Sequence, residues 1–277
     1  MFGGDIVTFN INFTYVVRVL YFATPSIIKS CSSAAISPDV LLSAAHCLVE
    51  KETDPVDHNN IQLTVLGPFA NEMMFRVKKA YIHPEYKPNK AYDISLIQAE
   101  SPLPVKPLEV SWTPTAYNGE DCLAAGFGSR YIHPFQGKLA IPVLSWIPYP
   151  SGLILPKPTC ALLKAIANEN VICILLLGGV GPCGGDSGGP IICNGALHGL
   201  LSRGMILGGD NCGAARGILV YESVHAYREW IFTTITKSND LSSSRPVRGS
   251  LLLLTLVLFL SLGSHRNTVH PIIYLKL

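Results

Sequence analysis

The chain alternates short runs of apolar and β-branched residues with residues that favour turns. Such runs occupy residues 15–21, 61–65 and 74–77 in the first part, and residues 191–193 and 197–201 in the second. Alternating β-branched and aromatic side chains favour strands because they pack well on a pleated surface. Twenty prolines and twenty-four glycines separate the runs. Frequent turns between short strands predict an all-β barrel or sandwich.

One segment near the end of the chain has a different period. Apolar residues recur there at the spacing of an α-helix, at Val224, Tyr227, Trp230 and Ile231. Ser223 precedes them, and serine is a common residue at the start of a helix. We therefore expect one helix after the last strand.

The length and charge of the chain narrow the class of protein. An all-β unit often contains about 200–250 residues, so 277 residues suffice for a large core. The net charge is +2, and no stripe rich in lysine and arginine is present. So small a charge predicts no nucleic-acid partner and no attraction to an anionic membrane surface.

The cysteine content indicates an oxidising compartment. An even number of cysteines suggests a framework of disulfides, but sequence alone leaves about a hundred pairings open. No Cys-x-x-Cys pair occurs, so a zinc or redox site is not favoured. The eight cysteines are Cys31, Cys47, Cys122, Cys160, Cys173, Cys183, Cys193 and Cys212.

Three short motifs carry candidate chemistry. They are Leu-Ser-Ala-Ala-His-Cys at 42–47, Tyr-Asp-Ile-Ser-Leu-Ile at 92–97, and Gly-Asp-Ser-Gly-Gly-Pro at 185–190. A serine hydroxyl is a weak nucleophile at neutral pH, so it needs a neighbouring base, and the base needs an orienting group. An aspartate before a strand can also simply cap a turn. The motifs supply the candidate triad His46, Asp93 and Ser187.

The order of these three residues and their flanking residues resemble the chymotrypsin-like (trypsin-fold) serine proteases. The resemblance covers roughly residues 1–236. It implies two six-stranded antiparallel β-barrels, about residues 1–111 and 112–236, with a C-terminal helix and an active site in the cleft between the barrels. Residues 237–277 fall outside it as a tail.

The resemblance also implies a role for each residue of the motifs. His46 is the general base, Asp93 orients its imidazole and stabilises the imidazolium, and Ser187 is the nucleophile. The backbone N–H groups of Gly185 and Ser187 form the oxyanion hole. Asp186 pairs with the amino group of the mature N-terminus.

Further positions follow from the same resemblance. Ser202 supports Asp93, and the specificity pocket has Gly181 at its base and Gly204 and Leu219 on its walls. A local gap would instead bring Gly217 to the second wall. The implied disulfides are Cys31–Cys47, Cys122–Cys193, Cys160–Cys173 and Cys183–Cys212.

Two features depart from the family's pattern. The family's mature N-terminus is usually two branched apolar residues and two glycines, whereas this chain has Met1, Phe2, Gly3 and Gly4. No signal peptide or activation site is visible, so we expect the chain to begin where the mature enzyme begins. Arg203 occupies a position that is usually tryptophan and places a cation near the substrate backbone.

Some members of the resembled family bind calcium in a loop that would lie near residues 67–77 of this chain. The loop near residues 67–77 contains only Glu72 as an acid, so we expect no metal and no cofactor. The apolar run at 251–262 is shorter than the ~20 residues of a membrane-spanning helix. We favour a disordered tail or gene-model artefact, with a GPI-anchor signal as the alternative. Asn12 begins a glycosylation sequon whose use stays open.

The sequence therefore predicts a secreted, monomeric serine endopeptidase that cleaves after apolar or small residues. Gly181 carries no carboxylate for a lysine or arginine side chain, and Leu219 would shorten the pocket. The expected partners are protein or peptide substrates and protein protease inhibitors. The alternative is a protease-fold binding protein with little activity, which Arg203 and the altered N-terminus motivate.

Overall fold

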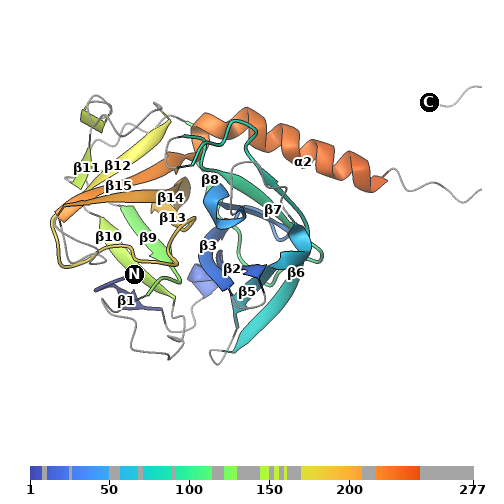
Figure 1. The fold of residues 1–277 in the computed structure, drawn as a ribbon, viewed down its shortest axis with the longest axis horizontal. Coiled ribbons are helices and arrows are strands. Elements are labelled where there is room, and N and C mark those ends of the chain that lie inside the picture. Colours follow the sequence, from blue (N-terminus) through green and yellow to red (C-terminus); the bar gives the residue numbers. More distant parts are fainter. Residues whose placement is uncertain are drawn as a thin grey trace, which may run out of the picture.

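The computed structural model describes residues 1–7, 11–24, 27–49, 57–67, 71–88, 91–113, 122–129, 144–149, 153–155, 159–160, 170–207 and 216–243. Two β units lie side by side, and the long C-terminal helix runs past the first of them (Figure 1). The mostly β architecture with one C-terminal helix confirms the fold class expected from the sequence.

The first unit is a closed six-stranded barrel in the order β2-β3-β4-β7-β6-β5. Buried and partly exposed residues alternate along its first strand, as a strand with one face on a core requires. Val17, Leu41 and Leu63 fill the barrel and are fully buried. The strands are β2 (Val16–Thr24), β3 (Ile27–Ala35), β4 (Val40–Ser43), β5 (Ile61–Leu66), β6 (Glu72–Ile82) and β7 (Ser95–Ala99).

The second unit is a nine-stranded sheet with the path β1-β10-β9-β13-β14-β15-β12-β11, and β8 pairs with β14. The sequence predicts a second closed barrel of six strands, whereas the described strands form this open path. Its longest strands are β14 (Ala196–Leu207) and β15 (Arg216–Ser223). The others are β1 (Asp5–Ile6), β8 (Glu109–Val110), β9 (Cys122–Gly126), β10 (Ser145–Tyr149), β11 (Ile154–Leu155), β12 (Val171–Leu176) and β13 (Pro190–Cys193).

The helical segment begins where the sequence predicts. It starts as a 3-10 turn, η6 (Val224–Tyr227), and continues as α2 (Arg228–Ser243). Ser223 takes the N-cap position with extended backbone, but its side chain makes no capping hydrogen bond. Because α2 runs to Ser243, the first residues of the predicted tail are helical. The apolar run at 251–262 lies outside the described residues.

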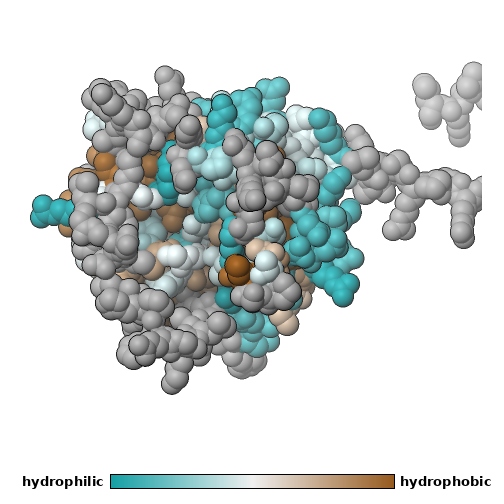
Figure 2. Space-filling model, viewed as in Figure 1, coloured by the Kyte–Doolittle hydropathy of each residue, from teal (hydrophilic) through white to brown (hydrophobic). Residues whose placement is uncertain are grey.

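One apolar core joins the two units. It contains Leu42 and Leu96 of the first barrel, Ala125 and Leu200 of the second sheet, and Ile231 of α2. In Figure 2, the larger brown areas lie over the second sheet, and most of the coloured residues visible over the first barrel and α2 are teal or pale. Among the described residues, no helix is both long and apolar enough to cross a membrane.

Candidate active site

The candidate nucleophile lies in a tight turn between β12 and β13. The Asp186 N–H donates to the Cys183 carbonyl at 3.0 Å, and the Gly189 N–H donates to the Asp186 carbonyl at 2.9 Å. Gly185 and Gly188 have φ values of 99° and 76°, in the left-handed region that favours glycine. The glycines of the motif are therefore required by the path of the turn.

This turn is attached to the first barrel. The Ser32 N–H donates to the Ser187 carbonyl at 2.8 Å, and the Ser32 hydroxyl donates to the Gly185 carbonyl at 2.9 Å. Cys47 Sγ lies 3.8 Å from the Ser187 carbonyl oxygen. Two residues of the first unit thus hold a turn of the second, which places Ser187 at the junction of the two units.

His46 and Asp93 form a close pair at the same junction. His46 lies in η2 (Ala45–Cys47), and Asp93 follows Tyr92, whose φ of 57° is unusual for a residue with a side chain. His46 Nδ1 lies 2.8 Å from Asp93 Oδ2, and the His46 backbone N–H donates to Asp93 Oδ1 at 3.0 Å. The Ser202 hydroxyl also donates to Asp93 Oδ2, at 2.7 Å.

Asp93 remains ionised despite its burial. Its side chain is 8% exposed, whereas that of His46 is 35% exposed. Burial by itself raises the pKa of Asp93, but the contacts from His46 and Ser202 outweigh it and hold this pKa below its usual value. The carboxylate can therefore orient the imidazole and stabilise a positive charge on it.

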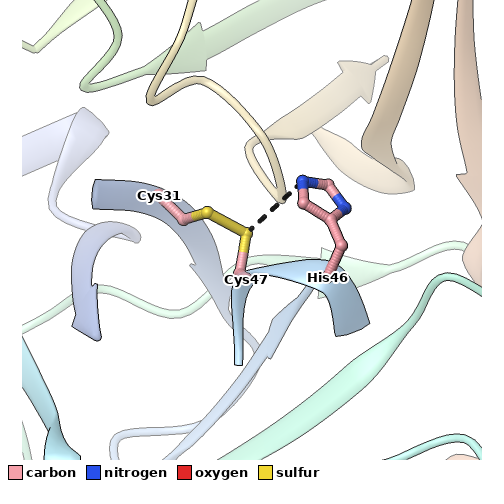
Figure 3. A group of neighbouring side chains, drawn as sticks. All are labelled: Cys31, His46 and Cys47. Carbon is pink, nitrogen blue, oxygen red and sulfur yellow. Dashed lines mark hydrogen bonds between the residues drawn. A yellow bond between two sulfur atoms is a disulfide. The ribbon is translucent and has the colours of Figure 1, made fainter. Parts of the chain in front are cut away.

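The imidazole points its second nitrogen toward a disulfide. His46 Nε2 lies 3.9 Å from Cys47 Sγ, and Figure 3 shows the Cys31–Cys47 bond beside the ring. No hydrogen bond joins His46 Nε2 to Ser187 Oγ in the described part of the chain. Both residues contact Cys47 Sγ, and catalytic hydrogen bonds are often long without substrate.

The same three residues have the spacing of a metal site. The ligand atoms of Cys31, His46 and Cys47 all lie within 4.8 Å of one another. The two sulfur atoms are bonded to each other, so neither is a thiolate that could bind a cation. This group therefore offers one imidazole ligand and does not make a metal site.

The nucleophile turn contains two backbone N–H groups for which the described residues supply no acceptor. In the described part of the chain, no protein acceptor takes the N–H of Gly185 or of Ser187. The neighbouring amides differ, because those of Asp186, Gly188 and Gly189 all donate to carbonyls. The two unused donors are the pair expected for an oxyanion hole, which must keep its N–H groups for the substrate oxygen.

The Asp186 side chain points into the protein. It is fully buried, and its Oδ2 lies 3.1 Å from the α-amino group of Met1. The N–H groups of Gly128 and Cys183 also donate to it, at 2.7 and 2.8 Å. Burial raises the pKa of Asp186 above its usual value, although the amino group and the N–H groups oppose the shift. Met1 thus occupies the predicted partner position despite departing from the family's pattern.

The two residues proposed for the walls of the specificity pocket lie on neighbouring strands, and the proposed base lies between β12 and β13. Gly204 of β14 pairs directly with Leu219 of β15, while Gly217 pairs with Ile206. This register places Leu219, not Gly217, opposite Gly204. Leu219 is 3% exposed and packs in a core cluster with Met1 and Tyr221. Gly181 exchanges two backbone hydrogen bonds with Phe2, at 2.8 and 3.1 Å.

Three disulfides are described: Cys31–Cys47, Cys122–Cys193 and Cys160–Cys173. They are three of the four pairs that the resemblance implies. Cys183 is also disulfide-bonded, and its expected partner Cys212 lies outside the described residues. A cavity of about 640 Å³ lies elsewhere, between Tyr15, Lys106 and Trp146, and contains no residue of the candidate site.

Two features of the site do not follow from the sequence motifs. Arg203 turns inward: its guanidinium donates to the Ser202 hydroxyl at 3.1 Å and lies 3.9 Å from the Glu222 carboxylate. Glu222 is fully buried, and it belongs to none of the three motifs. Its signal is a carboxylate directly after the apolar run Leu219-Val220-Tyr221, since acids are seldom buried without a partner.

Two joined β units that bring a histidine–aspartate pair and a serine turn to one junction have the architecture of a class of serine hydrolases. The chain belongs to the trypsin family, because residues 8–231 match the sequence model of the family described as Trypsin. It is 27% identical to mouse "Kallikrein 1-related peptidase b1", over 75% of this chain and 81% of that protein. It is 29% identical to human "Serine protease 1" (76% and 81%) and to "Alpha-fibrinogenase albofibrase" of Trimeresurus albolabris (76% and 79%).

Proposed function

We propose that this protein is a secreted serine endopeptidase that hydrolyses peptide bonds through an acyl-enzyme. His46 accepts the Ser187 hydroxyl proton as the oxygen attacks the carbonyl carbon of the substrate. The Gly185 and Ser187 N–H groups stabilise the negative oxygen of the tetrahedral intermediate. His46 then donates the proton to the leaving amine, and water releases the acyl group by the same steps.

The observation that carries the proposal is the contact between the buried Asp93 carboxylate and the imidazole, with Asp93 Oδ2 2.8 Å from His46 Nδ1. A binding protein has no need for an ionised carboxylate that is desolvated, bonded by Ser202 and aligned with an imidazole. Such an arrangement stabilises an imidazolium, which forms only when the histidine takes a proton. The N–H groups of Gly185 and Ser187 would stabilise the negative oxygen of the tetrahedral intermediate that forms at the same time.

The substrates that fit the pocket are peptides with a small or apolar residue before the scissile bond. Gly181 offers no charge, so an arginine or lysine side chain would be buried without a partner. Leu219 lies opposite Gly204 and supports a shortened pocket, which favours alanine, valine or leucine over phenylalanine and tyrosine.

The disulfides favour an extracellular location, because such bonds persist in oxidising compartments. There the partners would be protein or peptide substrates and protein inhibitors of proteases. We propose a monomer without a cofactor, since both halves of the candidate site come from one chain. Attachment of the C-terminal tail to a membrane is the alternative for its location.

A peptide library tests both the activity and the pocket. The oxidised, folded chain should cleave after small apolar residues, and Ser187→Ala should cleave nothing. Leu219→Gly is the matched pocket variant, and it should extend cleavage to phenylalanine and tyrosine. A dominant preference for arginine or lysine would contradict the pocket, and equal cleavage by Ser187→Ala would contradict the nucleophile. Absence of cleavage by a folded parent would favour the binding-protein alternative.

A further inference from the structure

A buried ion pair lies behind the candidate triad. Glu222 is fully buried, and its Oε1 lies 3.9 Å from Nη1 of Arg203, whose side chain is 15% exposed. The Tyr227 hydroxyl donates to Glu222 Oε2. Glu222 Oε1 has no hydrogen-bond partner, and an unsatisfied buried oxygen in a native protein calls for a reason.

Arg203 links this pair to Asp93. Its Nη1 donates to the Ser202 hydroxyl at 3.1 Å, and Ser202 donates to Asp93 Oδ2 at 2.7 Å. An arginine can only donate, and a serine hydroxyl has one proton. The arginine therefore occupies an acceptor site of Ser202 and directs the serine proton to Asp93. That same Asp93 oxygen holds His46 Nδ1.

Arg203 also offsets the negative charge of two neighbouring buried carboxylates, Glu222 and Asp93. Burial raises the pKa of Glu222, the Asp93 carboxylate raises it further, and the Tyr227 hydroxyl and Arg203 oppose the shift. The titratable groups around Glu222 are Tyr227 of η6, Arg203 of β14, and Asp93 and Tyr92 before β7. His46 lies beyond Asp93, and His83 packs on Tyr92 and Tyr227. Without Arg203, two carboxylates would repel each other in a region of low dielectric.

We propose that Arg203 and Glu222 are a positioning pair for the triad, with Glu222 holding the arginine against Ser202 so that Ser202 fixes Asp93. The inference rests on the proposed function, which supplies the role of Asp93. It also assigns Arg203 a place within the protein instead of on the substrate-binding surface. Neither residue touches the reacting atoms, so the pair acts only through Ser202 and Asp93.

Steady-state kinetics of four variants test the pair: Arg203→Met, Glu222→Gln, Arg203→Lys and the double variant Arg203→Met/Glu222→Gln. Loss of a hydrogen bond to a charged group predicts a fall in kcat of about tenfold for each single variant, with KM within about twofold. Arg203→Lys keeps the charge and should retain more activity than Arg203→Met. Exposed Arg216→Met and Glu229→Gln, on β15 and α2, are the matched controls and should match the parent.

The pH profile separates positioning from mere structural support. Removing the cation of Arg203 should move the ascending limb of kcat/KM to higher pH by about half a unit. The reason is that less electrostatic repulsion then acts on the protonated His46, so the pKa of His46 rises. Removing the Glu222 anion should move the limb to lower pH, and the double variant should lie near the parent. The double variant also avoids an unpaired buried charge, so it should fold where a single variant fails.

Three results would overturn the proposal. An increase in KM with unchanged kcat would place Arg203 on the substrate. A fall in the melting temperature without opposite pH shifts would make the pair structural. Unchanged kinetics in both single variants would show that the pair has no role.

If the parent cleaves no peptide, the proposed function fails, and the pair is then tested by the NMR signal of the His46 Nδ1 proton. A displaced signal in both single variants would support the positioning pair, and an unchanged signal would overturn it.

Discussion

At the residue scale, Asp93 collects most of the polar contacts of the candidate site. Its carboxylate accepts hydrogen bonds from the His46 backbone N–H and the Ser202 hydroxyl and pairs with His46 Nδ1, although the side chain is only 8% exposed. These contacts are made to the charged form and therefore lower its pKa. Asp93 is thus a residue whose charge the folded state requires.

The first prediction concerns the pH dependence of unfolding. Because the folded pKa of Asp93 lies below the unfolded value of about 3.9, its contribution to stability is present above about pH 4. This contribution is lost as pH falls through the folded pKa. Asp93→Asn should therefore lower the free energy of unfolding more at pH 6 than at pH 3. Urea unfolding at the two pH values measures this difference. The exposed control Asp5→Asn should show little difference, and a pH-independent loss in Asp93→Asn would contradict the assignment.

At the element scale, the turn of residues 183–189 determines where Ser187 lies. The second prediction is that Gly188→Ala destabilises the protein by about 3 kcal/mol, because the left-handed backbone disfavours a side chain. An added Cβ would also collide with the Ser43 hydroxyl and the Ser32 carbonyl. Gly184→Ala in the same turn is the control, since its Cβ would meet nothing within 4 Å. Equal melting temperatures for the two variants would show that the turn tolerates another path.

The Cys31–Cys47 disulfide connects β3 to the segment that carries His46. It closes a loop with a sequence separation of 16, for which chain entropy gives about 3 kcal/mol. The third prediction is that Cys31→Ala/Cys47→Ala loses about this much stability and most of its activity, because Cys47 contacts both His46 and Ser187. Cys160→Ala/Cys173→Ala, more distant from the triad, should lose stability but keep its turnover per folded molecule. Equal losses of turnover would contradict the proposed role of the bond.

At the scale of the whole molecule, the start of the chain is held against the second unit. The Met1 amino group lies 3.1 Å from Asp186 and 2.9 Å from the Ser145 hydroxyl, and Met1 is 1% exposed. The fourth prediction is that acetylating this amino group destabilises the folded chain by about 3 kcal/mol, because it leaves a buried carboxylate without its cation. Asp186→Asn should reduce the effect of acetylation. An acetylated protein with unchanged unfolding would show that the amino group does not support the turn.

Much of the fold and of the candidate site could be predicted from the sequence because the signals are local. Period-two runs became β2, β5 and β6, and the motifs at 42–47 and 185–190 form η2 and the tight turn that contains Ser187. The inward path of Arg203 could not be predicted, since it depends on the proximity of Glu222, nineteen positions later. The register that pairs Gly204 with Leu219 and not Gly217 likewise depends on a bulge between Leu201 and Arg203.

The central claim is that Ser187 is a nucleophile activated by His46, and a fluorophosphonate probe tests it most directly. Oxidised, folded protein should react with one equivalent of probe, and peptide mass mapping should place the adduct on Ser187. Ser187→Ala should not react, and Asp93→Asn should react much more slowly while remaining folded. A folded parent that does not react, or an adduct on any other residue, would contradict the account.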